Sequence, residues 1–212
     1  MKLLLLGATG RTGKQLLAQA LDRGHEVTAL VRSDSKIEAG KHPPRLRVRI
    51  GDVTEAAILE SALDGQDAVI SALGSDRLTE LLGTDFITRS TRAIVSAMQR
   101  RGVNRLMMLS ALGVGETAAL APPLVRLFFR TVLRAVGEDK GAGEAHLRAS
   151  NLDWTLVYPP QLTDGPLTGK YRSGQDLRVR GMAKISRADV AHFMLGEIGN
   201  ARYSRKAVIL TH

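Results

Sequence analysis

The stretch G-A-T-G-R-T-G, residues Gly7–Gly13, decides the fold of this chain. It follows an apolar run, Lys2–Leu6, which predicts a buried strand, and it precedes a helical pattern over Lys14–Arg23. The first two glycines permit a tight turn and a close approach of backbone to a ligand, and Gly13 lets the helix pack closely on the strand. We therefore expect a strand, a glycine loop and a helix, the unit that opens a doubly wound fold.

Strand-like and helical segments alternate along the rest of the chain. Further strands are expected at Glu26–Val31, Arg47–Ile50, Asp67–Ala72, Arg105–Ser110, Trp154–Tyr158 and Ala207–Leu210. Further helices are expected at Thr54–Leu63, Thr84–Arg101, Pro122–Val136, Glu138–Ser150 and from a Ser186/Asp189 capping box to about Ile198, with a loop at Ser33–Arg45. This alternation predicts an α/β protein with a doubly wound parallel sheet and right-handed crossovers, built as a single domain over residues 1–212.

Composition restricts the classes of function. The chain has 212 residues, of which 44% are apolar and none is cysteine, and it has no apolar run of the roughly 20 residues that a membrane span needs. The absence of cysteine excludes disulfides and thiolate chemistry, and we expect a cytoplasmic protein. The net charge of +9 is spread along the chain and only 4% of residues are aromatic, so neither nucleic-acid nor membrane binding is expected.

The glycine loop is expected to bind the pyrophosphate of a dinucleotide. Unpaired amides at the start of a helix and the positive end of its dipole attract phosphate without any lysine. The alternative is a glycine turn that binds no ligand. The loop residues expected to contact the cofactor are Gly7, Thr9, Gly10, Arg11, Thr12 and Gly13. In this Rossmann-type arrangement residues 1–112 mainly bind the cofactor, and residues 113–212 mainly supply the substrate side.

Arg32 stands where the second strand ends, the position that selects between NAD and NADP. An acidic residue there accepts hydrogen bonds from the ribose hydroxyls of NAD, whereas a guanidinium pairs with the 2′-phosphate of NADP. The sequence therefore favours NADP(H), and Arg11 and Lys36 are expected to add to the same anion pocket. Alternatively, Arg32 and Lys36 are solvated loop charges.

Two further strand ends are expected to line the cofactor groove. Asp52 and Val53 follow the third strand, where a carboxylate can accept a hydrogen bond from the amino group of adenine. An N-capping role explains Asp52 equally well. Leu73 and Gly74 follow the fourth strand, where the backbone must pass close to the ribose and the nicotinamide.

The chain lacks the Tyr-x-x-x-Lys pair that serves as acid and orienting base in short-chain dehydrogenases. Lys140 stands at the place expected for that lysine, but four residues before it lies Val136, which cannot protonate a carbonyl oxygen. Ser110 ends the fifth strand, where ligands collect in open α/β sheets, and is expected to orient the nicotinamide or the substrate. Alternatively, its hydroxyl caps a turn. Ser110 is not in a G-x-S-x-G elbow, so hydrolase chemistry is not expected.

The remaining charged groups predict no further site. The five histidines are scattered without metal-ligand spacing, so no metal is expected. Arg126, Arg130 and Arg134 form a basic stripe at i, i+4 spacing on one predicted helix. The interpretations of this stripe are a solvated edge, a dimer face or a membrane contact. The solvated edge is favoured, and we expect a monomer or a weak homodimer whose partner is a small-molecule acceptor.

The sequence resembles the atypical short-chain dehydrogenase group that includes NADPH-dependent flavin reductase, also called biliverdin reductase B. The similar segments cover nearly the whole chain and include G-A-T-G-R-T-G at Gly7, L-V-R at Leu30, G-Q-D-A-V-I at Gly65, P-P-Q at Pro159, P-L-T-G-K-Y at Pro166 and H-F-M-L at His192. The resemblance implies an NADPH-dependent reductase that passes a hydride to a flat conjugated acceptor. Flavins are the first candidate acceptors, followed by quinones and biliverdin-like tetrapyrroles.

The resemblance also implies roles for single residues. It places Ser110 beside the nicotinamide and lines the cofactor groove with Arg32, Asp52, Val53 and Gly74. Pro159 is a further candidate for cofactor binding. The flavin reductase has a histidine after the paired prolines, and this chain has Gln161, which cannot donate a proton near neutral pH. Reduction of flavins or quinones is expected to tolerate this change better than reduction of biliverdin. The chain is also similar to NmrA-like sensors, so a redox sensor that binds NADP(H) without turnover is the alternative.

Overall fold

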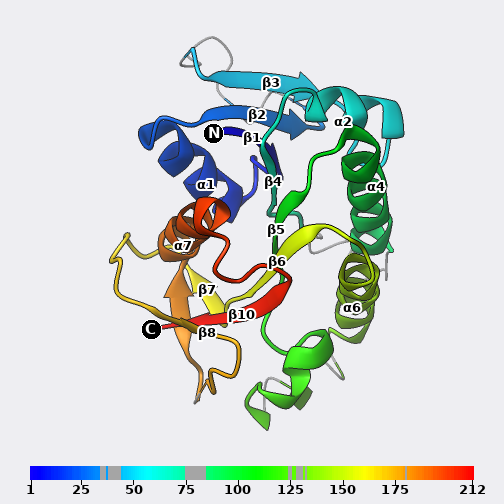
Figure 1. The fold of residues 1–212 in the computed structure, drawn as a ribbon. Helices are drawn as coiled ribbons and strands as arrows, with labels where there is room; N and C mark the ends of the chain where they lie inside the picture. The colour runs from blue at the N-terminus through cyan, green and yellow to red at the C-terminus, as the bar shows by residue number, and fades with distance from the viewer. Residues whose placement is uncertain are drawn as a thin grey trace.

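The computed structural model describes residues 1–33, 37, 44–74, 85–123, 126, 127, 131, 133–179 and 181–212. Within them an eight-stranded sheet runs through the molecule, with helices on both of its faces (Figure 1). Its strands lie in the order β3-β2-β1-β4-β5-β6-β10-β8. Their bounds are β1 Lys2–Leu6, β2 Glu26–Val31, β3 Leu46–Ile50, β4 Ala68–Ser71, β5 Arg105–Leu109, β6 Asp153–Tyr158, β8 Arg172–Gly174 and β10 Lys206–Thr211.

Neighbouring strands of this sheet pair in parallel, except β10 and β8, which pair antiparallel. A second sheet of two strands pairs β7 (Gln161–Thr163) with β9 (Lys184–Ser186). The order 3-2-1-4-5-6 of the first six strands is that of doubly wound dinucleotide-binding proteins. The predicted fold class is therefore confirmed.

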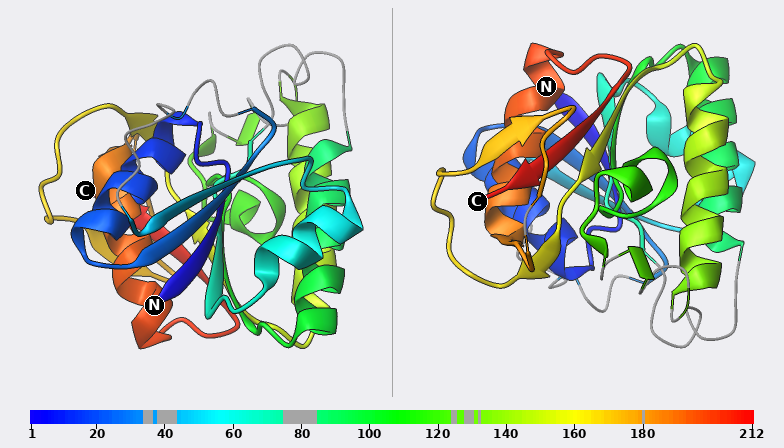
Figure 2. Two further views of the ribbon diagram at one scale, coloured as in Figure 1. Left: turned by 90° about the horizontal axis from the view of Figure 1, so that it is seen from above. Right: turned by 90° about the horizontal axis from the view of Figure 1, so that it is seen from below.

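Helices cover the sheet in two layers, seen from above and below in Figure 2. On one face α1 (Arg11–Asp22) packs against α7 (Arg187–Asn200). The other face carries α2 (Ala56–Leu63), α4 (Phe86–Arg101) and α6 (Arg134–Arg148), with α4 between the other two. A short 3-10 helix, η2 (Gly115–Ala119), follows β5 and contacts α6.

The leucine run of β1 shows why this sheet is central. Leu3 and Leu5 belong to the core cluster shared with α1 and α7, whereas Leu4 and Leu6 belong to the cluster under α2 and α4. All four side chains are at most 2% exposed. Because successive side chains of a strand point to opposite faces, a strand covered on both faces is apolar at every position. Each buried leucine contributes roughly 1.5–3 kcal/mol to folding.

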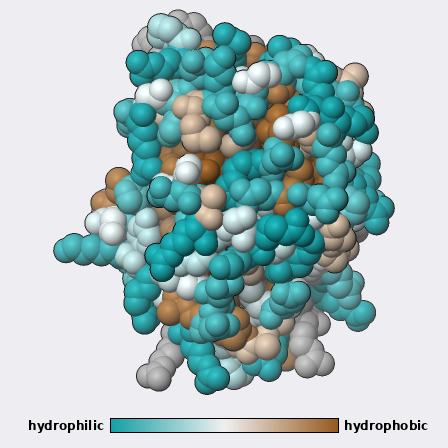
Figure 3. Space-filling model, in the orientation of Figure 1, coloured by the Kyte–Doolittle hydropathy of each residue, from teal (hydrophilic) through white to brown (hydrophobic). Residues whose placement is uncertain are grey.

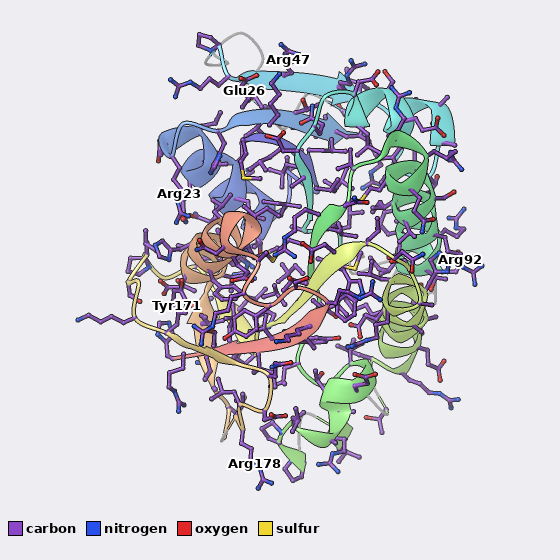
Figure 4. The ribbon with its side chains drawn as sticks, viewed as in Figure 1. Arg23, Glu26, Arg47, Arg92, Tyr171 and Arg178 are labelled. Atoms are coloured by element: carbon purple, nitrogen blue, oxygen red, sulfur yellow. The ribbon has the colours of Figure 1, made fainter. Side chains whose placement is uncertain are left out.

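The surface carries the charges. The face seen in Figure 3 is mostly hydrophilic, with apolar side chains in separate patches. Arg47 of β3 points outward at the top of the view in Figure 4, and Arg92 of α4 points outward at its right. Among the described residues, no helix is long and apolar enough to cross a bilayer.

One predicted helix boundary is wrong. Helix α6 continues through Gly137, whose amide donates to the carbonyl of Leu133 at 2.9 Å, so no helix ends at Val136 and none begins at Glu138. A glycine inside a helix costs only about 1 kcal/mol relative to alanine, which packing on α4 readily offsets. Of the preceding stretch, residues 124, 125, 128–130 and 132 lie outside the described part of the chain.

Other boundaries shift by a few residues. Helix α1 begins at Arg11 rather than Lys14, so the end of the glycine loop forms its first turn. At α7 the backbone amide of Asp189 donates to Ser186 Oγ at 2.9 Å, which confirms the capping prediction. Strands β7, β8 and β9 were not predicted, because three residues are too few to show an alternating pattern.

Candidate functional site

The glycine loop makes two backbone approaches that only glycine allows. Gly7 has φ +82°, and a Cβ there would lie 2.6 Å from the carbonyl oxygen of Ala72, just after β4. A Cβ on Gly13 would lie 1.9 Å from the carbonyl oxygen of Gly7. The Gly10 amide closes the turn by donating to that same oxygen at 3.0 Å. The loop therefore lies directly against the ends of β1 and β4, with no side chain between them.

Helix α1 offers its first amides to an external anion. Its N-cap is Gly10, which has no side chain to cap the helix, and its first turn contains no acidic residue. The amides of Arg11, Thr12 and Gly13 are thus left without a side-chain acceptor in the cap, at the positive end of the helix dipole. We call this group of backbone amides the glycine cradle. A phosphate group fits it, because the glycine backbone can approach the phosphate without obstruction by a Cβ.

The carboxyl ends of the parallel strands meet at one edge of the sheet, and most candidate residues follow them. The Gly51 amide donates to the carbonyl oxygen of Val31 at 2.9 Å, which joins the ends of β2 and β3. Hydrogen bonds from Thr54 are the largest effect that lowers the pKa of Asp52, and the charge of Arg32 lowers it further. The structure therefore brings Arg32 and Asp52 together.

Asp52 does not cap α2. Its Oδ1 accepts from the amide of Thr54 at 2.8 Å and from the hydroxyl of Thr54 at 2.6 Å, whereas the N-cap of α2 is Glu55. The N-capping interpretation is wrong because the helix begins later than predicted. The carboxylate instead fixes the turn that follows β3.

The other groove candidates differ in exposure. Val53 is buried, Leu73 is half-buried against the core, and Gly74 is exposed with open space around its Cβ position.

The remaining candidates lie on other segments. Pro159 is buried, and its carbonyl oxygen accepts a hydrogen bond from the Leu112 amide at 3.0 Å. Gln161 is exposed at the start of β7. Thr9, between the loop glycines, is half-buried. Lys36 lies outside the described residues.

Arg11 points toward the substrate side. Its guanidinium pairs with Asp164, which also accepts from Arg187 at 2.7 Å. The side chains of Arg11 and Asp164 are 67% and 55% exposed. This ion pair links the glycine loop to the segment after β7 rather than to Arg32.

Ser110 belongs to a buried polar cluster that the sequence did not reveal. Its Oγ donates to Glu144 Oε1, and the hydroxyl of Tyr158 donates to Glu144 Oε2 at 2.6 Å. Arg148 donates to the Tyr158 oxygen at 3.1 Å. Glu144 is 3% exposed and Ser110 8%. The hydroxyl of Ser110 is therefore held by a side chain of α6 and is not a turn cap.

Electrostatics distinguish the two acids of this cluster. Burial raises the pKa of Glu144, opposed by the hydrogen bonds of Ser110 and Tyr158 and by the charges of Arg148 and Lys140. Burial and the neighbouring carboxylate also raise the pKa of Tyr158, which stays protonated as a donor. Lys140, half-buried on α6, thus acts on the cluster through its charge on Glu144.

A pocket of about 530 Å³ opens beside the cluster. Its lining residues come from the segment after β5, from Arg126 and from α6: Gly113, Val114, Gly115, Ala118, Arg126, Arg134, Gly137, Glu138 and Gly141. Gly115 has φ +52°, and a Cβ there would lie 2.6 Å from Glu144 Oε2, so the wall of the pocket reaches the carboxyl group. Arg134 pairs with Glu138 at 2.8 Å and is 73% exposed, which agrees with a solvated edge; Arg130 lies outside the described residues.

A family model described as NAD(P)H-binding matches residues 7–201. The chain belongs to this NAD(P)H-binding family. The uncharacterized protein YwnB of Bacillus subtilis is 27% identical over 216 residues, covering 97% of this chain and 96% of that protein. The structure is also similar to the anaerobilin reductase ChuY of Escherichia coli O157:H7, with 25% identity, a TM-score of 0.80, and coverage of 99% and 96% of the two chains.

The same fold occurs in a short-chain dehydrogenase/reductase of Veillonella parvula solved in complex with NADP. Its TM-score is 0.83, with 20% identity and coverage of 100% of this chain and 94% of that chain. At this identity the likeness concerns the fold. Family membership and the glycine cradle together support NAD(P)H binding at the sheet edge of this protein.

Proposed function

We propose that this protein is an NADPH-dependent reductase that passes a hydride to a flat conjugated acceptor, with flavins and quinones as the first candidates. The observation that carries the proposal is the hydroxyl of Ser110, backed by the buried Glu144, at the sheet edge where the glycine cradle opens. Burying a carboxyl group costs stability unless hydrogen bonds compensate the lost hydration. At Glu144 one of the compensating bonds fixes the hydroxyl of Ser110 at the carboxyl end of β5.

Arg32 supports the preference for NADPH. It is exposed at the end of β2, where NAD-binding proteins place a carboxylate for the ribose hydroxyls. A guanidinium there accepts the extra negative charge of a 2′-phosphate through paired hydrogen bonds. The nearby Asp52 accepts two hydrogen bonds from Thr54 through its Oδ1 atom, which hold this carboxylate in the turn after β3.

The residues of the chain bind and orient, and the bound nicotinamide supplies the hydride. The amides at the start of α1 hold the pyrophosphate, and the exposed Gly74 leaves room for a ring at the end of β4. Ser110 orients the acceptor from the end of β5. Stacking of the acceptor at roughly 3–3.5 Å provides the near-attack geometry. The exposed Gln161 leaves the rim of this region without the histidine of the flavin reductase.

The proposal is tested by mixing the purified protein with NADPH and FMN or menadione and following the nicotinamide absorbance. Acceptor-dependent loss of absorbance is expected. Saturable NADPH binding without such loss would support the redox sensor instead. A Glu26→Gln variant, changed at an exposed carboxylate at the start of β2, is the matched control and should keep the activity.

A further inference from the structure

We propose that Ser110 and Glu144 form a proton relay that protonates the reduced acceptor, the task for which Gln161 is unsuited. This inference rests on the proposed reductase function and concerns the proton transfer that follows hydride transfer at the same site. Two carboxyl oxygens of Glu144 have two hydroxyl partners, Ser110 on one side and Tyr158 on the other. Ser110 and Tyr158 both lie at the carboxyl ends of parallel strands, but Ser110 is 8% exposed whereas Tyr158 is 0% exposed. Ser110 is therefore the outlet of the relay.

The hydrogen bonds allow a proton to pass from Glu144 through Ser110 to the acceptor. A hydroxyl both donates and accepts, so a protonated Glu144 can donate to Ser110 Oγ while Ser110 donates outward. Tyr158 is fully buried in β6 and receives a hydrogen bond from Arg148 at 3.1 Å. Tyr158 therefore holds the second oxygen in place and has no route to a substrate of its own.

The surroundings of Glu144 favour its protonated form more than solvent favours that of an exposed glutamate. Burial is the largest effect and raises the pKa of this carboxyl. Lys140 and Arg148 on the same helix oppose it, and Glu116 of η2 pairs with Arg148 at 3.1 Å, which weakens that opposition. Helix α4 contributes the neutral Thr91 to the same side of α6, beside Gly143. The described groups that face Glu144 thus include a tyrosine that stays protonated and two cations, Lys140 and Arg148.

The relay supplies the proton that completes the reduction of a quinone. The quinone takes a hydride, with its electron pair, from the bound nicotinamide and becomes a hydroquinone monoanion. The phenolate oxygen then forms a new O–H bond with the proton of Ser110, whose oxygen takes the proton of Glu144 in the same step. Glu144 is left as a carboxylate, and in this proposal it takes its next proton from water in the pocket, whose wall at Gly115 lies against Oε2.

Different acceptors should depend on this relay to different degrees. Hydride transfer to FMN leaves the reduced ring as an anion that is stable at neutral pH, so it needs no donated proton. A hydroquinone monoanion is a stronger base and takes up one proton. Glu144→Gln and Ser110→Ala should therefore impair reduction of menadione much more than reduction of FMN.

The test compares the wild type, Glu144→Gln, Ser110→Ala and the double variant with both acceptors from pH 5 to 9. For menadione we expect each single variant to lower kcat by about 100-fold, the usual contribution of a positioned acid, and the double variant to lose no more than either. The wild-type kcat should fall as pH rises and Glu144 loses its proton, whereas Glu144→Gln should show no such fall. Glu26→Gln, at an exposed carboxylate at the start of β2, should match the wild type.

A second readout is independent of turnover. Infrared difference spectra of the wild type should contain the carbonyl stretch of a protonated carboxylic acid that disappears on raising the pH, and Glu144→Gln should lack it. A Glu144→Gln enzyme that keeps the wild-type pH profile and rate with menadione would overturn the relay alone. If the folded wild type oxidises NADPH with neither acceptor, the reductase function itself fails, and the relay fails with it.

Discussion

A Cβ on Gly13 would lie 1.9 Å from the carbonyl oxygen of Gly7, so the first turn of α1 and the end of β1 are in direct backbone contact. Gly13→Ala should force the helix away from the strand, destabilise the protein by roughly 1–3 kcal/mol and abolish NADPH binding. Thermal unfolding and fluorescence titration with NADPH measure the two effects. Gly196→Ala, in a helix position with open space around the Cβ, is the control and should bind NADPH normally. Equal NADPH affinity of both variants would contradict the proposal that the glycine cradle binds NADPH.

Arg32→Glu should weaken NADPH binding more than NADH binding. The guanidinium contributes charge-assisted hydrogen bonds to the 2′-phosphate, and their loss is expected to cost about 1.5–3 kcal/mol for NADPH alone. Titration calorimetry with both coenzymes measures the difference. Arg47→Glu, the same charge change at an exposed position of β3, should leave the ratio of affinities unchanged. An equal loss for NADPH and NADH in Arg32→Glu would show that Arg32 does not select the cofactor.

Asp189 should make stability depend on pH in the acid range. Burial raises its pKa, but hydrogen bonds from Gly169, Thr168 and Ser186 outweigh burial and leave the pKa below its ordinary value. A carboxyl with a lowered folded-state pKa stabilises the protein above its unfolded-state pKa, and this contribution is lost as pH falls through the folded-state value. Asp189→Asn should therefore lower the free energy of unfolding near neutral pH, with the gap to the wild type closing toward acid pH.

Urea unfolding of the wild type and Asp189→Asn at a series of pH values checks this expectation. Asp176→Asn, at an exposed loop position, is the control and should follow the wild type. A constant gap across the acid range would mean that the asparagine costs packing rather than ionic hydrogen bonds.

The fold was predictable because its signals are local. The leucine run of β1, the glycines that follow it and the Ser186–Asp189 cap each lie within a few residues of one another, and spacing alone indicates their structure. The groove candidates at the strand ends were predictable for the same reason, since parallel strands bring their carboxyl ends to one edge.

The buried cluster was not predictable, because it depends on contacts between distant segments. Ser110 and Glu144 are 34 residues apart, and Glu144 lies in a helix whose sequence is rich in charged residues. The only signal was its position on the same face as Val136 and Leu147. Asp139 is a similar case: it caps α4 from another helix, accepting from the amides of Ile87 at 2.9 Å and Thr88 at 2.8 Å. No local pattern identifies a cap supplied by a neighbouring helix.

The central claim is that the amides of the glycine loop, together with Arg32, bind NADPH at the carboxyl edge of the sheet. Calorimetric titration of the purified wild-type protein with NADPH tests it most directly. We predict saturable binding of one NADPH per chain, tighter than that of NADH under the same conditions. Titration curves without saturation, or equal affinities for the two coenzymes, would contradict the claim.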